Sequence, residues 1–435
     1  MAAFHEGFAD IVALLQRFTF TELVEHQLFE AKGKLENYSV LGELATQFGE
    51  ALEGNRGALR SMIGRWEGDR WVPLKPSPTD YLTHTDAHDR GAVLVATIFD
   101  VFQRIYNFRT ADLMRIASQG TGILPEGSLN HDLVRRLARE ACAIAEHLLS
   151  ICIRALDYCP PSDISFGDYL RALITADLDI APEDESGYRL ALMEAFRARG
   201  IFPERVNTFS VESLRWNRPD FTEKEEKALQ FIAEQLKPLI RELVETGTRE
   251  DLFNRSKVAK GLQHGLLMSK QDVLDTTEWE HFLNKLGLTS QPVSKLFGPD
   301  STKVKFLGNP DHPITRSPKI EVYTLRPAFR AGSEGRQIEQ VVVTFTQREM
   351  ADIGENGEKQ RMVFRGGCTL ILSLGNLAEV EYVIVKNIRS YRRFLAQQSY
   401  FNGEDATGAG PSASFYSDGT REPRIEFRLL HQHQP

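Results

Sequence analysis

Residues 91–107 read GAVLVATIFDVFQRIYN, and this stretch decides how the first half of the chain folds. Apolar residues occupy nearly every face of the helix that these residues would form. A helix that is apolar all round is buried among other elements of its domain. We therefore expect residues 91–107 to form the buried central helix of a helical domain.

Helical periodicity continues on both sides of this central helix. Before it, the periodicity covers residues 3–18 and 21–54, and it is lost in a loop rich in proline and glycine at residues 64–90. After it, Gly200 lies just past the last periodic segment, where a glycine commonly ends a helix. The sequence therefore predicts one all-helical domain over residues 1–203. The later segments are residues 109–117, 130–157, 165–177 and 186–199.

The chain after residue 203 changes from helices to strands. Residues 221–247 are amphipathic, with a break expected at Pro238, and shorter helices follow up to residue 288. A stretch rich in proline, glycine and serine then leads into β-branched runs of strand length. These runs are KIEVYTL (319–325), QVVVTFTQ (340–347), CTLILSL (368–374) and EVEYVIVK (379–386).

The last two runs are joined by GNLA, which predicts a β-hairpin. A helix is expected at residues 390–401, a mobile segment near residues 402–422, and a final strand at residues 424–430. The predicted fold class is α+β, mainly α. Its expected parts are a helical lobe, a helical connector and a small α+β module, at residues 1–203, 204–290 and 291–435.

Composition excludes several classes of protein. The net charge of −8 argues against a nucleic acid or an anionic membrane surface as a partner. No run of 18 apolar residues and no secretion signal are visible, so we expect a cytoplasmic protein without a membrane span. Four cysteines without CxxC spacing predict buried free thiols in a reducing compartment. These are Cys142, Cys152, Cys159 and Cys368.

Two acids lie one helical turn apart in HEGFAD, residues 5–10. Glu6 and Asp10 are four residues apart, so they share one face of the predicted helix. One carboxylate could bind a metal while the other holds a histidine ligand in its correct tautomer. The structural alternative is that both acids only interact favourably with the dipole at the start of the helix.

Two further segments place polar side chains before the central helix. Arg60 in GALRSMIG (57–64) is either a surface arginine or a donor of two hydrogen bonds to a polarised carbonyl oxygen. His88 in the loop before residue 91 could project into a cleft and stabilise developing negative charge. Asp86 or Asp80 could orient it. The structural alternative is a loop histidine beside aspartates that cap the next helix.

In this order, HEGFAD, LRSM and a histidine before a buried helix resemble the C-terminal helical lobe of thermolysin-like zinc metallopeptidases, the gluzincins. The resemblance covers about residues 1–203 and implies peptide-bond hydrolysis. It implies that Glu6 is a zinc ligand and that Asp10 supports the zinc site from the second shell. It further implies that Arg60 contacts the substrate carbonyl and that His88 stabilises the tetrahedral intermediate.

The histidine loop departs from the family's pattern. HDRG is one residue shorter before its glycine than the family's loop, and the acid expected to orient the histidine falls on Thr83. Asp86 or Asp80 would have to take that role, so the catalytic set is His88 and Arg60, with Asp86 as the orienting acid. His84 is a rival for the place of His88.

The family's zinc site also needs an HExxH helix, which supplies two ligands and the base that activates the metal-bound water. None of the eleven histidines belongs to an HExxH. We therefore expect zinc in the complete protein but none in this chain alone. The chain would be a truncated or split metallopeptidase, inactive as given. Its partners would be a peptide or protein substrate and a missing N-terminal lobe or separate chain.

Two alternatives remain open. The chain could be a non-catalytic pseudoenzyme or scaffold protein built on the same helical lobe. The resemblance could also be chance, in which case Glu6, Arg60 and His88 would not converge on one cleft. In the β module, the FRGGC sequence ending at Cys368 predicts a tight turn and a buried thiol rather than a nucleophile, because no histidine accompanies it.

Overall fold

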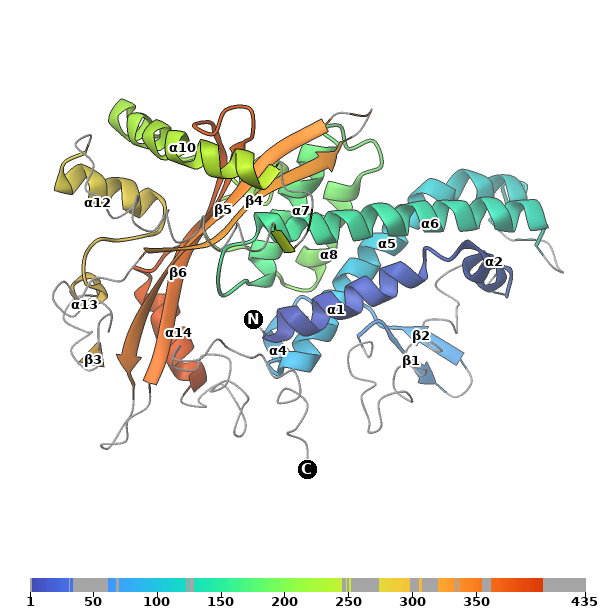
Figure 1. Ribbon diagram of the computed structural model, residues 1–435. Coiled ribbons are helices and arrows are strands. Elements are labelled where there is room, and N and C mark those ends of the chain that lie inside the picture. Colours follow the sequence, from blue (N-terminus) through green and yellow to red (C-terminus); the bar gives the residue numbers. More distant parts are fainter. Residues whose placement is uncertain are drawn as a thin grey trace. The chain divides into compact units, whose positions relative to one another are not determined.

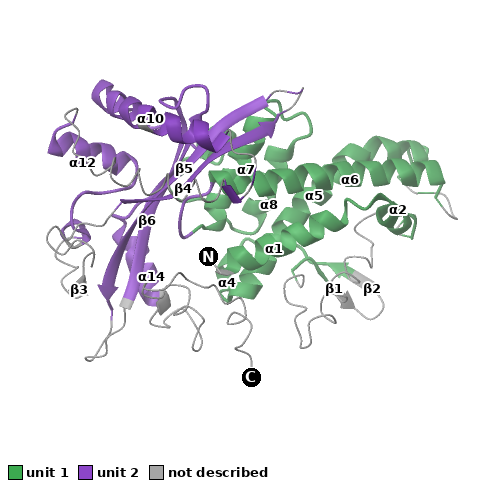
Figure 2. Ribbon diagram, in the orientation of Figure 1, with its two compact units in different colours: residues 1–158, 164–215 green, residues 159–163, 216–435 purple. Residues whose placement is uncertain are grey.

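A computed structural model of the chain divides into two compact units (Figures 1 and 2). Unit 1 comprises residues 1–158 and 164–215, and unit 2 comprises residues 159–163 and 216–435. The structure describes residues 2–30, 32–33, 62–67, 70–122, 124, 129–244, 248, 250–251, 274–297, 305–306, 320–332, 335, 337–353 and 361–401.

Unit 1 is assembled around one long helix, α5 (Ala87–Ala117). The expected central stretch is buried, since every residue from Gly91 to Phe99 is inaccessible to solvent or nearly so. Three helices pack against α5: α1 (Ala2–Arg17), α6 (His131–Arg154) and α8 (Tyr188–Ala198). The other helical elements are α2 (Thr21–Glu30), α4 (Asp80–Thr83), the 3₁₀ helix η3 (Ala155–Tyr158), α7 (Phe166–Ile180) and α9 (Val211–Leu214).

The ends of these helices follow the local sequence. The side chain of Asn130 accepts a hydrogen bond from Asp132 N at the start of α6, and Ser165 forms a capping box with Asp168 at the start of α7. Gly200 has φ of 70°, as expected for the glycine that ends α8. Local capping therefore fixes where the helices begin and end.

Part of the segment expected as a loop at residues 64–90 is regular. β1 (Gly64–Glu67) and β2 (Arg70–Pro73) pair in antiparallel fashion, with Trp66 opposite Trp71. Strands of four residues are too short for their alternation to stand out among prolines and glycines, which is why the sequence did not predict them.

Unit 2 contains an antiparallel sheet whose central strands are β5 (Gln337–Asp352) and β6 (Arg361–Ser373). β4 (Ile320–Ala331) pairs with β5, and β7 (Val380–Lys386) pairs with β6 in the predicted hairpin. β3 (Lys305–Phe306) pairs with the end of β5. The four predicted strand runs are confirmed, and so is the α+β, mainly α, fold class.

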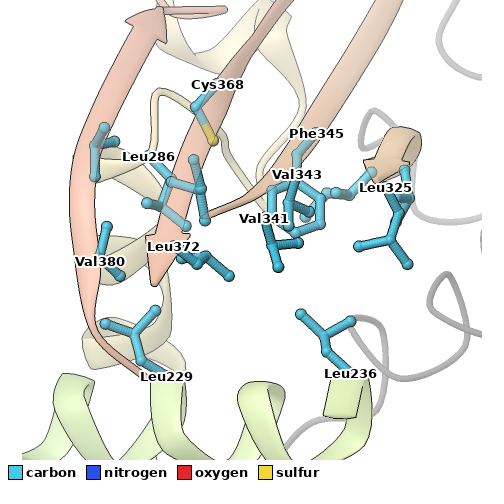
Figure 3. Packing of buried hydrophobic residues seen from close by; sticks show 14 of the residues in the cluster. Leu229, Leu236, Leu286, Leu325, Val341, Val343, Phe345, Cys368, Leu372 and Val380 are labelled. Atoms are coloured by element: carbon cyan, nitrogen blue, oxygen red, sulfur yellow. The ribbon is translucent and has the colours of Figure 1, made fainter. Parts of the chain in front are cut away.

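Two helices from residues 216–290 share a hydrophobic core with this sheet. α10 (Glu223–Val244) and α12 (Thr276–Lys285) contribute Leu229, Leu236 and Phe282 to a buried cluster that also contains Val343 and Phe345 of β5 (Figure 3). The division of the chain therefore differs from the expected one. Residues 216–290 belong to the same unit as the strands, and the change of unit comes after residue 215 instead of residue 203.

A second cluster in unit 2 is aromatic. α13 (Val293–Leu296) is followed by Phe297, whose ring lies 5.4 Å from that of Phe394 on α14 (Tyr391–Phe401). Phe364 of β6 lies 5.5 Å from the same Phe394 ring. The predicted helix at residues 390–401 is therefore confirmed. The expected mobile segment and final strand lie outside the described residues.

Two local predictions in unit 2 are wrong. α10 continues through Pro238. A proline removes one backbone donor from a helix, but α10 tolerates this loss because Pro238 lies on its exposed side. Gly366 and Gly367 lie inside β6 instead of in a turn. A Cβ at Gly366 would come within 2.6 Å of the Ile388 backbone, so the glycine serves close packing.

Two predictions about the whole chain have an answer in the described part. Among those residues, no helix combines the length and the apolar character needed to cross a membrane. All four cysteines are free and buried, as predicted, and burial raises the pKa of the Cys152 thiol to about 12.

Candidate functional site

The first helix of the chain carries Glu6 and Asp10. α1 is amphipathic and holds Glu6 at the edge of its buried face, with its side chain 14% exposed. The first turn of α1 contains no acid, so the helix-dipole alternative does not account for Glu6. The buried face of α1 consists of Phe4, Gly7, Ile11, Leu14 and Leu15, and the buried Phe18 follows the end of the helix.

His88 lies in the first turn of α5. Asp86 caps this helix, and its carboxylate accepts hydrogen bonds from His88 N at 2.8 Å and from Asp89 N. Both of these hydrogen bonds come from backbone N–H groups, whereas Asp86 was expected to orient the imidazole of His88. Asp86 positions His88 by fixing the start of the helix.

Asp80, the other acid considered for His88, is engaged elsewhere. Its Oδ2 accepts a hydrogen bond from Ser77 N at 2.9 Å and lies 3.9 Å from Arg199 Nε. Arg199 also pairs with Asp100 of α5. Asp80 therefore fastens the turn that precedes α5 to the end of α8.

The structure brings Glu6 and His88 together although they lie far apart in the sequence. His88 Nδ1 is 3.7 Å from Glu6 Oε2. This distance allows an electrostatic interaction but is too long for a hydrogen bond. The His88 side chain is 34% exposed, so this pair is accessible to a ligand. An imidazole and a carboxylate at this separation can both reach one small polar group.

The rival histidine, His84, is held by the backbone. His84 Nδ1 lies 2.8 Å from Asp80 O, and His84 O accepts a hydrogen bond from Arg90 Nε. Of the two histidines, His88 is the one that approaches Glu6. His5, next to Glu6, is half-buried, and this burial lowers the pKa of its imidazole.

The remaining predicted site residues are Asp10 and Arg60. Asp10 is half-buried on α1, one turn after Glu6, in the position that the helical spacing predicts. Arg60 lies outside the described residues. The roles of both residues stay predictions.

Sequence reasoning missed two glycines at this site. Gly7 of α1 and Gly91 of α5 face each other where the two helices cross, and both are buried. For Gly7, a glycine inside a helical pattern and away from either end is the signal that could have found it, whereas Gly91 stood at the expected start of the central helix. The approach of Glu6 to His88 depends on this crossing.

The described residues do not complete a metal centre. A catalytic zinc ion has three protein ligands and an open position. Within the described parts of the chain, no three histidine, cysteine, aspartate or glutamate side chains are grouped closely enough to hold a metal ion. Glu6 could therefore contribute to a zinc site only together with donors from elsewhere.

We compared the chain with known proteins in three ways. No family model, no curated protein and no solved structure matches it.

Proposed function

We propose that unit 1 is the helical lobe of a thermolysin-like zinc metallopeptidase. Glu6 would bind zinc, and Asp10 would support the zinc ligands from one turn away. Arg60 and His88 would donate hydrogen bonds to the carbonyl oxygen of a bound peptide. The single observation that supports this proposal is the 3.7 Å approach of His88 to Glu6, two residues that the resemblance assigns to one active site.

The other zinc ligands and the catalytic base have to come from outside these residues. No HExxH occurs in the 435 residues, and the described ones offer no three-ligand group. We propose that an HExxH helix on a longer chain or on a second chain completes the site. No catalytic step through the metal is derived from this chain.

The proposed role of His88 is supported by its accessibility and its fixed backbone. A ring N–H held at the start of α5 could donate a hydrogen bond to an oxygen that becomes negative during peptide-bond cleavage. A donor that is already in place needs no reorganisation when the charge develops, which is how such groups lower a barrier. Asp86 fixes the backbone that carries this donor through the cap of α5.

The test is to sequence the DNA next to this reading frame and to express any longer product. We expect an in-frame HExxH, close to one zinc ion per protein and hydrolysis of a fluorogenic peptide. Glu6→Gln should remove most of the bound zinc and the activity, because a neutral amide is a poor zinc ligand. Zinc content by mass spectrometry and the hydrolysis rate are the two measurements.

Glu22→Gln is the matched control. It removes the same charge as Glu6→Gln, and Glu22 is exposed in the first turn of α2. It should leave both zinc content and activity unchanged. A longer frame without HExxH, or zinc that is unaffected by Glu6→Gln, would contradict the proposal. A stable protein that binds no zinc and has no longer reading frame would favour the scaffold alternative.

A further inference from the structure

The backbones of α1 and α5 touch at Gly7 and Gly91. A Cβ added to Gly7 would lie 2.8 Å from Gly91 O and 3.3 Å from Gly91 Cα. A Cβ added to Gly91 would lie 3.1 Å from Gly7 N and 3.2 Å from Ala3 O. Real Cβ atoms almost never come within 3.0 Å of a backbone atom, so the crossing has no room for a methyl group on Gly7.

Neither glycine is needed for its backbone conformation. Both lie inside helices, and neither is among the glycines with positive φ. A glycine inside a helix destabilises it relative to alanine, because it loses more conformational freedom on folding. Close approach of the two helices is the property that offsets this cost, since the distance between packed helices depends on the side chains at their contact.

The crossing lies directly beside Glu6 and His88. Glu6 precedes Gly7, and a Cβ on Gly91 would lie 3.3 Å from Glu6 Cβ. His88 is three residues before Gly91, so it lies one turn away on the same side of α5. Any increase in the distance between the two helices at Gly7 and Gly91 would move the Glu6 carboxylate away from the His88 ring.

We propose that Gly7 and Gly91 are positioning residues, which set the separation of Glu6 and His88 by allowing backbone contact between α1 and α5. The importance of this separation for catalysis rests on the proposed function. The separation itself does not, so it can be tested in this chain without zinc and without a peptidase assay.

A thiol-bridging reagent reports the separation. In a Glu6→Cys, His88→Cys variant of the full chain, dibromobimane becomes strongly fluorescent only where it joins two nearby thiols. The four native cysteines are at most 7% exposed, so they should react little with the reagent. The fluorescence of each single cysteine variant measures the background. We expect efficient bridging in the double variant and a several-fold lower yield when Gly7→Ala is added, because its Cβ would meet Gly91 O at 2.8 Å. Gly91→Ala, whose Cβ contacts are 3.1 Å or longer, should lower the yield less.

Gly375→Ala is the matched control, because the nearest atom to a Cβ at Gly375 is a side-chain oxygen 3.9 Å away. It should leave the bridging yield unchanged. Equal yields with and without Gly7→Ala, in protein that circular dichroism shows to be folded, would overturn the inference. If neither alanine variant folds, the double cysteine variant with both glycines unchanged decides the question. Bridging in that variant supports the close contact of Glu6 and His88, and no bridging overturns the inference. Failure of the zinc test above would leave these results unaffected.

Discussion

At the scale of single residues, Arg199 is the buried group on which the candidate site depends most. Its side chain is almost fully buried and pairs with Asp100 of α5 and, at a longer distance, with Asp80 of α4. Its carbonyl oxygen accepts a hydrogen bond from Tyr81 N. Arg199 therefore holds together the end of α8, the central helix and the turn that leads to His88.

Replacing Arg199 by glutamine should strongly destabilise unit 1. Removing one partner of a buried ion pair leaves the other charge uncompensated, which costs about 3 to 5 kcal/mol. Urea denaturation followed by circular dichroism measures this loss, and hydrogen exchange should rise in peptides that contain residues 77–90.

Arg104→Gln is the control for this prediction, since Arg104 pairs with Glu194 on the surface. Pairs of this kind contribute about 1 kcal/mol or less. Similar losses for the two arginines would show that the Arg199 cluster is no more important than a surface pair.

At the scale of elements, Glu225 links two helices of unit 2. Its carboxylate caps the start of α10 by accepting a hydrogen bond from Thr222 N at 2.7 Å. It also pairs with two residues of α12, Lys285 Nζ at 2.7 Å and His281 Nδ1 at 3.1 Å. Burial alone would raise the pKa of Glu225, but these donors outweigh it and lower the pKa to about 2.

This link should fail in acid. Because the pKa of Glu225 is lower in the folded than in the unfolded protein, the unfolded state binds the proton more readily. The stabilisation is complete above the ordinary pKa of 4.5 and is lost as the pH falls towards about 2. We expect Glu225→Gln to lower the melting temperature near neutral pH, and its difference from the native protein to shrink through this window.

Thermal unfolding of both proteins over a series of pH values measures the effect. Glu223→Gln is the control, since Glu223 is exposed on the same helix and pairs with the exposed Lys227. A constant difference between native protein and Glu225→Gln down to the acid limit would exclude Glu225 as the titrating group.

At the scale of the whole molecule, each unit has its own kind of core. Unit 1 surrounds a helix whose residues 91–99 are all buried, whereas the sheet of unit 2 packs one face against α10 and α12. Phe282 of α12 is fully buried in that cluster, with its ring 5.6 Å from the ring of Trp279. Helices that come before the strands in sequence are therefore part of the sheet's core.

Phe282→Ala tests this division of the chain. Truncating a fully buried phenylalanine costs about 3 to 5 kcal/mol, from lost burial and the cavity left behind. Hydrogen exchange should increase in β5 and β6, because their apolar side chains share the same cluster. Phe329→Ala, at a half-exposed position of β4, should cost about 0.5 kcal/mol or less. Unchanged exchange in β5 and β6 would restore the idea of an independent helical connector.

The sequence by itself determined the elements whose signal is local and long. The apolar stretch at residues 91–107, the four β-branched runs and the cap at Gly200 each depend on side chains close together in the chain. The same is true of the shared face of Glu6 and Asp10, which follows from helical spacing alone.

Only the tertiary structure decided which distant residues meet. It placed His88 rather than His84 beside Glu6, gave Asp80 to Arg199, and joined residues 216–290 to the sheet. These outcomes depend on how closely helices cross and on which buried charges find partners. Such contacts are set by packing between elements, and nothing in the local pattern around Gly7 or Gly91 specifies the helix on the other side.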